Sequence, residues 1–308
     1  MTTLVAPPTA EHARHRHAAA PEGARARGGR LATHAVLLVL AVVWLLPILW
    51  AVYTSLRPES DTKKYGYASI AHALTFQNYS DAWTQGQIPH FFKNTVIITV
   101  PAVIITLFLA SCVAFVVARF SFRFNLVMLL LFTAGNLLPQ QTLLSPLFKI
   151  FLYVHVPTFL SQSGTLYDSA FGLIVINVAF QTGFCVFVLS NFMRTIPEEI
   201  TEAGMVDGAS VWTQYWRLTL PLCRPALAAL ATLLTTWIYN DFFWALTLMS
   251  TGSKLPITTA INNLKGEFAQ NNNLLSAGAL IIAMPTLVVY LVLQRQFIAG
   301  LTLGSTKG

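Results

Sequence analysis

The sequence predicts an all-α, polytopic membrane protein with six transmembrane helices, and three observations lead to this fold class. Only 10% of the 308 residues are charged, whereas a soluble globular domain carries about 25%. Hydrophobic residues make up 55% of the chain, and the mean hydropathy is +0.61. These few charges cannot cover a water-facing surface of this size, which excludes a soluble enzyme, a nucleic-acid-binding module and a disordered chain. The third observation is a set of six long stretches that are poor in charge.

Each of these stretches is long enough to cross a bilayer, which takes about 20 apolar residues in a helix. Five contain no Asp, Glu, Lys or Arg, and the remaining one contains a single charge, Asp241. Residues 150–167 are also free of charge, but Pro157, Gly164 and several polar residues favour an external loop with a short helix there. The predicted spans are residues 31–56, 94–118, 124–148, 169–193, 225–253 and 268–294.

The basic residues predict the domain organisation and the orientation. Residues 1–30 are rich in Ala, Arg and His, and we expect a disordered cytoplasmic tail there, followed by a membrane domain over residues 31–308. With the amino terminus inside, twelve of the 19 Lys and Arg residues lie on the cytoplasmic side, including eleven of the twelve arginines. This asymmetry predicts that both termini are cytoplasmic. The three cysteines are an odd set without metal-ligand spacing, so we expect neither a disulfide framework nor a metal site.

One cytoplasmic segment, residues 194–224 between the fourth and fifth spans, carries helix signals that a simple connector does not need. Pro197 suits the first position of a helix that ends near Asp207, with Gly208 after its C-cap. Asp, Asn, Ser and Thr side chains cap helix N-termini, and a second short helix can begin in this way. The elements expected after Gly208 are a cap at Ser210, a helix over residues 211–217 and a stop at Pro221.

The first of these helices has a face nearly free of bulky side chains, so another surface can approach its backbone closely. The alternative is an amphipathic helix on the membrane surface, which would carry large apolar residues on one face and basic residues on the other. This helix has neither, and we therefore expect a docking helix for a cytosolic partner. The face comprises Ile200, Ala203, Gly204, Asp207 and Gly208, with Glu198, Glu199 and Glu202 on the more polar side.

The same segment resembles the EAA loop of ABC importer permeases, and its Asp-Gly-Ala-Ser form is similar to the carbohydrate branch, the maltose-type permeases. Gly204 departs from the family pattern, which usually has Ala there. Residues 237–246 are similar to the family's Trp-x-x-Asn-acid-Phe-x-Trp stretch, and residues 297–308 resemble its Gly-Leu-Thr-x-Gly-x-x-Lys-Gly tail. The EAA resemblance rests on Glu202-Ala203-Gly204, Asp207-Gly208-Ala209-Ser210 and Leu218-Thr219-Leu220-Pro221.

The resemblance implies the type I ABC importer permease fold in a prokaryotic cell membrane. The chain would form half of a translocation path together with a second, homologous permease subunit. Two cytosolic ATPase subunits would bind ATP and Mg²⁺, and an external binding protein would deliver a sugar. Residues 195–222 would form the coupling loop, the tail would reach the ATPase interface, and residues 251–273 match a loop that enters the binding protein. The implied coupling residues are Glu198, Glu199, Glu202, Ala203, Gly204, Asp207, Gly208, Ala209, Ser210 and Pro221.

This chain itself is expected to bind no cofactor and to catalyse no reaction. Lys254 follows Gly252 and Ser253, but the Gly-x-x-x-x-Gly-Lys spacing of a phosphate-binding loop is absent from the sequence. If ATP drives transport, another chain must therefore bind it.

Polar and aromatic residues within the spans are candidates for the translocation path. Asp241 is the sole ionisable residue well inside a span, and such a residue is a functional hypothesis by default. We favour a structural or gating role for it, because the resemblance places an acid here whatever the substrate. The amide side chains either line a polar cavity or form hydrogen bonds between helices. Each such interhelical hydrogen bond would contribute about 0.6 kcal/mol to stability. The candidates are Asn136, Gln140, Asn177, Gln181, Trp237, Asn240, Asp241 and Trp244, of which the last four share helical spacing with Thr247.

Three other functions compete with a sugar permease. An ion-coupled secondary transporter would need several buried charges and often internal repeats. An intramembrane enzyme would need a nucleophile with a base, or metal ligands, within the spans. A permease for another small polar solute, such as a polar amino acid or a phosphonate, is the closer rival. The scarcity of buried charge and the Asp-Gly-Ala-Ser loop favour a neutral di- or oligosaccharide.

Overall fold

The computed structural model describes residues 24–137, 139–264 and 271–302, and this part of the chain is helical apart from turns, loops and one isolated bridge between His155 and Thr165. Four helices are long and apolar enough to cross a membrane, and two bent helix pairs bring the number of candidate spans to six. The predicted fold class is thereby confirmed. The four long helices are α1 (Ala24–Ser55), α4 (Ile88–Arg119), α7 (Ala170–Met193) and α14 (Asn272–Thr302).

The third predicted span, residues 124–148, is broken into two helices. Helix α5 (Asn125–Leu137) and helix α6 (Gln140–Tyr153) meet at an angle of 95°. Pro139 precedes α6 in an extended conformation, because its ring and its missing N–H prevent it from continuing a helix. Helix α6 continues to Tyr153, so residues 150–153, the start of the predicted external loop, are helical.

The prediction of one continuous fifth span over residues 225–253 is wrong. Helix α11 (Arg224–Tyr239) ends before Asn240, and a separate short helix, α12 (Phe243–Leu248), follows. The Asn240 side chain donates a hydrogen bond to the Thr236 carbonyl at 2.8 Å, and the Asp241 carboxylate accepts one from the Trp244 N–H at 3.1 Å. These side chains compete for the backbone groups that a continuous helix would pair.

The predicted cytoplasmic segment is mostly helical. The stretch from residue 211 to residue 222 meets α11 at a bend of 72°. The elements of the segment are α8 (Glu198–Val206), α9 (Val211–Thr213), the π-helix η1 (Gln214–Thr219) and α10 (Leu220–Leu222). The prediction that Pro221 stops this helix is wrong. Pro221 lies in the first turn of α10, where the missing N–H of proline is tolerated.

The chain divides into two units, residues 1–50 and residues 51–308. The described part of the first unit belongs to α1, which begins at Ala24, inside the predicted tail; residues 1–23 lie outside the described residues. The second unit holds all the other elements. Its remaining short helices are α2 (Glu59–Tyr65), α3 (Gln77–Gln85), α13 (Ile257–Ala260) and the 3-10 helices η2 (Gly252–Lys254) and η3 (Ile261–Leu264).

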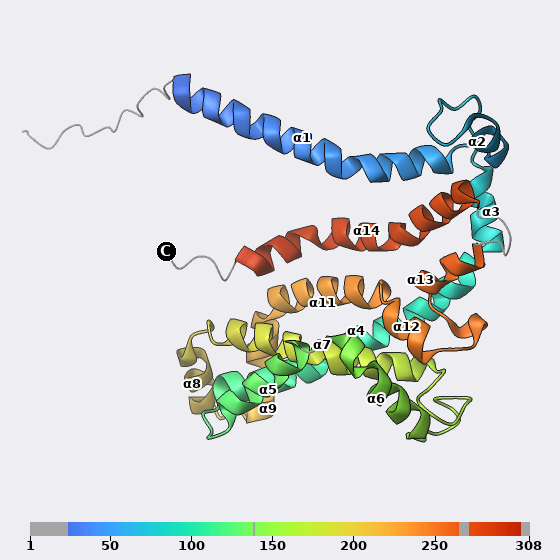
Figure 1. Ribbon diagram of the computed structural model, residues 1–308. Coiled ribbons are helices and arrows are strands. Elements are labelled where there is room, and N and C mark those ends of the chain that lie inside the picture. Colours follow the sequence, from blue (N-terminus) through green and yellow to red (C-terminus); the bar gives the residue numbers. More distant parts are fainter. Residues whose placement is uncertain (1–23, 138, 265–270, 303–308) are drawn as a thin grey trace, which may run out of the picture. The chain divides into compact units, whose positions relative to one another are not determined.

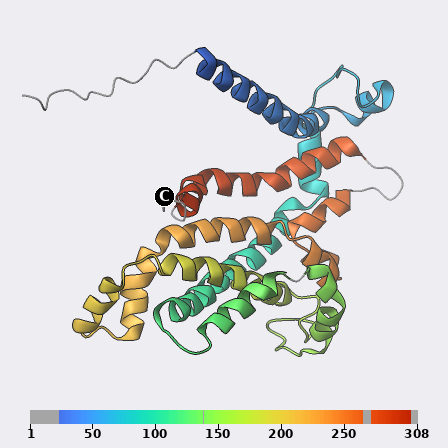
Figure 2. The same cartoon turned by 60° about the vertical axis from the view of Figure 1, so that its left-hand side comes forward.

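The core of the second unit forms where α4 packs along α7, and α11 lies between α4 and α14 (Figures 1 and 2). Ala102, Thr106, Ala110 and Ala114 of α4 are fully buried at a spacing of four residues, so they form one stripe of small side chains. Small residues let membrane helices approach closely, and Leu189 of α7 is likewise fully buried in this core.

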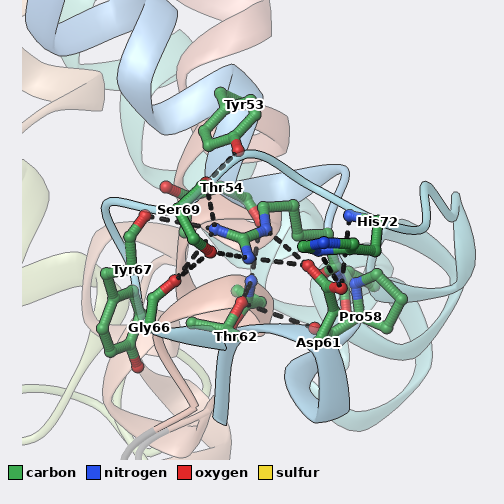
Figure 3. A network of polar contacts seen from close by, with 12 residues as sticks. Tyr53, Thr54, Pro58, Asp61, Thr62, Gly66, Tyr67, Ser69 and His72 are labelled. Carbon is green, nitrogen blue, oxygen red and sulfur yellow. Dashed lines mark hydrogen bonds and ion pairs between the residues drawn. The ribbon is translucent and has the colours of Figure 1, made fainter. Parts of the chain in front are cut away.

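A polar cluster fixes the chain after α1, around the buried Arg57 side chain (Figure 3). The Arg57 guanidinium donates hydrogen bonds to the Asp61 carboxylate at 2.6 and 2.9 Å and to the carbonyls of Gly66, Tyr67 and Ser69 at 3.1–3.3 Å. This hydrogen bonding holds the pKa of Asp61 below its usual value. The result is an ordered loop directly outside the first span.

Candidate functional site

A pocket of about 570 Å³ lies where the break between α11 and α12 faces α6 and α7. Seven of the eight predicted path residues line it, which places side chains from four helices and one break around a single space. The side chain of the eighth, Asn136, lies outside the described residues. The lining consists of Gln140, Asn177, Gln181, Trp237, Asn240, Asp241 and Trp244, together with Phe242 and Phe243.

Asp241 connects three elements at this pocket. Its carboxylate accepts a hydrogen bond from the Asn177 amide of α7 at 3.1 Å and another from the Trp244 N–H of α12. Its backbone carbonyl accepts a third, from the Thr258 hydroxyl of α13 at 3.0 Å. Both carboxylate oxygens are therefore engaged within the chain. This geometry fits the predicted structural or gating role, since Asp241 holds the broken helix against α7.

The aromatic side chains of the pocket differ in what they offer to a solute. Trp237 and Phe242 are 43% and 40% exposed, and the Trp237 ring packs on Phe184 with centroids 5.4 Å apart. Trp244, in contrast, is 2% exposed and packs against Phe180 at 5.2 Å. Trp237 and Phe242 therefore present free ring surface, whereas Trp244 supports the wall behind them.

The chemistry of the pocket suits a neutral, hydroxyl-rich solute. Carboxamide groups such as those of Gln140 and Gln181 can both donate and accept hydrogen bonds. Aromatic rings provide an apolar body against which C–H groups pack. The described lining contains one carboxylate, Asp241, and no basic side chain. Phe242 was missed from the sequence, because one more aromatic residue in an apolar stretch carries no distinguishing signal.

The second candidate site is the predicted cytoplasmic segment, residues 194–224, and its local structure follows the prediction closely up to the start of α9. Helix α8 begins at Glu198 after Pro197 and ends before Asp207. Gly208 has a φ of 77°, the left-handed conformation that glycine adopts most readily. The Ser210 hydroxyl accepts a hydrogen bond from the Thr213 N–H at 3.2 Å and so caps α9.

The orientation of α8 corrects one expectation about its small face. Gly204 is buried, and a Cβ added there would lie 2.7 Å from a terminal methyl group of Leu218. Gly204 therefore packs against the π-helix of its own chain and is not available to a partner. Helix α8 also carries two large apolar side chains that the prediction omitted, Met205 and Val206, which are 56% and 88% exposed. The predicted residues that are exposed are Glu198, Glu199, Ile200, Glu202, Ala203, Asp207, Gly208 and Ser210, whereas Ala209 and Pro221 are half-buried.

A pocket of about 380 Å³ lies between the acidic side of α8 and the C-terminal end of α4. Glu198 and Glu202 line it from α8, opposite Arg119 of α4 and Arg194, which follows α7. Arg119 donates one hydrogen bond to the Ile196 carbonyl at 3.3 Å, and its Nε and Nη2 atoms are buried without a partner in the described part of the chain. This side of α8 is therefore indented and carries two carboxylates, and the apolar Met205 side chain also lines the pocket.

Comparison with known proteins supports one family. The family described as "Binding-protein-dependent transport system inner membrane component" matches residues 110–302. The trehalose transport system permease protein SugB of Mycobacterium tuberculosis is 32% identical over 285 residues, which cover 91% of this chain and 100% of SugB. The melibiose/raffinose/stachyose import permease protein MelC of Bacillus subtilis is 30% identical and covers 88% of this chain and 94% of its own.

The fold has solved counterparts as well. A chain of a bacterial ABC transporter involved in the import of the acidic polysaccharide alginate superposes with a TM-score of 0.71 over 88% of this chain and 97% of its own, at 19% identity. At that identity the likeness concerns the fold alone. The family match and the two relatives cover both the pocket and the α8 segment. The chain therefore belongs to the family of inner membrane components of binding-protein-dependent transport systems.

Proposed function

We propose that this chain is a permease subunit of an ATP-driven importer for a neutral di- or oligosaccharide. The observation that carries the proposal is the pocket at the helix break, whose described lining combines carboxamides and exposed aromatic rings with one engaged carboxylate. SugB and MelC, which are named for trehalose and for melibiose, raffinose and stachyose, support the same class of solute.

An acidic saccharide is the natural alternative, because the alginate importer has the same fold. A polyanionic solute calls for arginine or lysine side chains along its path. The described lining of this pocket contains neither residue. The pocket therefore favours an uncharged solute over uronates, phosphonates and anionic amino acids.

The complete importer in this proposal contains a second, homologous permease subunit, two cytosolic ATPase subunits and an external binding protein. This chain supplies half of the path and no catalytic step, and ATP and Mg²⁺ bind to the ATPase subunits. Both termini face the cytoplasm of a prokaryotic cell. The outer surface of α8, with Ile200, Ala203 and Asp207 exposed, is the docking surface for one ATPase subunit.

The test is uptake by the complete importer in liposomes. A loaded binding protein is supplied outside, ATP inside, and the solutes compared are a neutral disaccharide, a neutral trisaccharide and a disaccharide of uronic acids. We expect ATP-dependent accumulation of a neutral sugar. Preference for the uronate would contradict the proposed solute class. Accumulation driven by an ion gradient without ATP would instead support a secondary transporter.

A further inference from the structure

The π-helix η1 brings a buried tyrosine from the cytoplasmic segment into the core between α4 and α7. Tyr215 is 2% exposed, and its hydroxyl lies 2.7 Å from the Ser111 hydroxyl and 3.5 Å from the Cys112 sulfur, both on α4. The Tyr215 ring packs against Phe115 of α4 at 5.4 Å. One side chain of the cytoplasmic segment thus contacts three residues within about one turn of α4.

The Tyr215 hydroxyl is shared between two polar groups of α4. Either hydroxyl can donate in the Tyr215–Ser111 hydrogen bond, and the Ser111 hydroxyl also lies 2.9 Å from the Phe108 carbonyl, to which it can donate. The Cys112 thiol donates to the Tyr215 oxygen. The Tyr215 hydroxyl lies between the Ser111 and Cys112 side chains in this set of hydrogen bonds. Removing the hydroxyl therefore disconnects the cytoplasmic segment from the polar groups of α4.

The same π-helix holds α8 by two contacts. Gly204 of α8 allows Leu218 to approach more closely than a Cβ would permit. The buried Gln214 side chain donates a hydrogen bond to the Ala209 carbonyl, just after α8, at 2.9 Å. A displacement of α8 therefore displaces η1, and η1 is joined to α4 through Tyr215.

The π-helix also makes the Tyr215 contact dependent on register. Single π-turns within α-helices often lie at functional sites, because they differ from the α-helix by one residue. Conversion of η1 to an α-helix would shift the register by one residue and turn the side chains by about 100°. Such a turn would withdraw the Tyr215 hydroxyl from Ser111. A conversion of this kind would give the contact two discrete states, formed and broken.

We propose that Tyr215 is a positioning residue that transmits the displacement of α8 to α4, and through α4 to the α4–α7 core. The inference rests on the proposed function, in which an ATPase moves α8. In this role the tyrosine hydroxyl converts the displacement that ATP hydrolysis causes into sugar movement. It contacts neither the sugar nor ATP.

The test compares Tyr215→Phe with the wild type in the complete importer in liposomes, with ATP hydrolysis and sugar uptake measured on the same sample. We expect the ATP consumed per sugar to rise at least threefold. Ser111→Ala should produce a similar rise, and the double variant should show no larger effect than either single one, because all three remove the same hydrogen bond. A loss of assembled complex would lower the rates of ATP hydrolysis and sugar uptake together and leave the ATP consumed per sugar unchanged.

Tyr239→Phe is the matched control. Tyr239 is also buried, and its hydroxyl donates to the Ile282 carbonyl at 2.9 Å, between α11 and α14 and away from the cytoplasmic segment. The ratio should stay at the wild-type value in this variant. A wild-type ratio in Tyr215→Phe, or an equal rise in Tyr239→Phe, would overturn the inference alone. If the wild-type complex moved no sugar on ATP, both the inference and the proposed function would fail.

Discussion

The stability cost of replacing Asn273, at the start of α14, can be derived from its contacts. The residue is fully buried, and its amide donates hydrogen bonds of 2.9 Å to the Thr54 carbonyl and to the Thr62 hydroxyl. It therefore ties α14 to the segment of the Arg57 cluster, and Figure 3 labels both acceptors. Replacement by alanine removes two hydrogen bonds between uncharged groups, each worth about 1 kcal/mol. We expect Asn273→Ala to lower the free energy of unfolding by about 2 kcal/mol, and by more if the vacated space stays empty.

The neighbouring Asn272 provides the matched control for this substitution. Its side chain is exposed and makes one hydrogen bond, to the Tyr67 hydroxyl at 3.1 Å. Asn272→Ala should cost at most about 0.5 kcal/mol, as is usual for surface positions. The measurement is denaturant unfolding of the purified proteins in the same detergent, followed by tryptophan fluorescence. Equal losses for the two variants would refute the reasoning, because burial and hydrogen bonding would then not determine the cost.

Three further predictions concern the pocket, the α8 segment and the loop before α7. Trp237→Ala should raise the KM for sugar uptake several-fold, whereas Trp83→Ala, which removes an equally exposed ring outside the pocket, should not. Gly208→Val should abolish uptake while membrane insertion persists, because a side chain at a φ of 77° costs about 1–2 kcal/mol and adds bulk beside α8. Gly164→Val, equally strained at a φ of 71° in the loop before α7, should retain uptake. Burial alone would raise the pKa of Asp168, but hydrogen bonds from Thr251 and Ser250 lower it to about 2. The contribution of Asp168 to stability should therefore be full above the unfolded pKa near 3.8 and fall as the pH drops toward 2, and Asp168→Asn should weaken the loss of stability in acid when melting is measured against pH.

Local signals account for what the sequence predicted well. The start of α8 after Pro197, its end at Asp207 and Gly208, and the Ser210 cap depend on residues close in the chain, and all lie where expected. The sequence also pointed to the residues of the pocket, because polar side chains stand out within apolar spans, where they are rare. Their roles in transport stay predictions.

The errors arose where side chains compete with the backbone or where packing decides. Asn240 and Asp241 bond to nearby backbone groups and end α11, although the hydropathy of this stretch suggests one continuous span. Gly204 faces inward because Leu218, much later in the sequence, packs on it. Helical spacing alone could not show which side of α8 this residue would occupy.

The interruption between α11 and α12 has a consequence for assembly. Residues 240–242 leave regular helix within a predicted span, and peptide groups that are not paired in a helix are not tolerated against lipid tails. A solitary copy in the bilayer would expose this interruption to hydrocarbon unless water or another protein surface covered it. Cells that lack the companion subunit should therefore accumulate little of this one, because an orphaned copy would be cleared by membrane proteases, and the abundance of the two chains should rise and fall together.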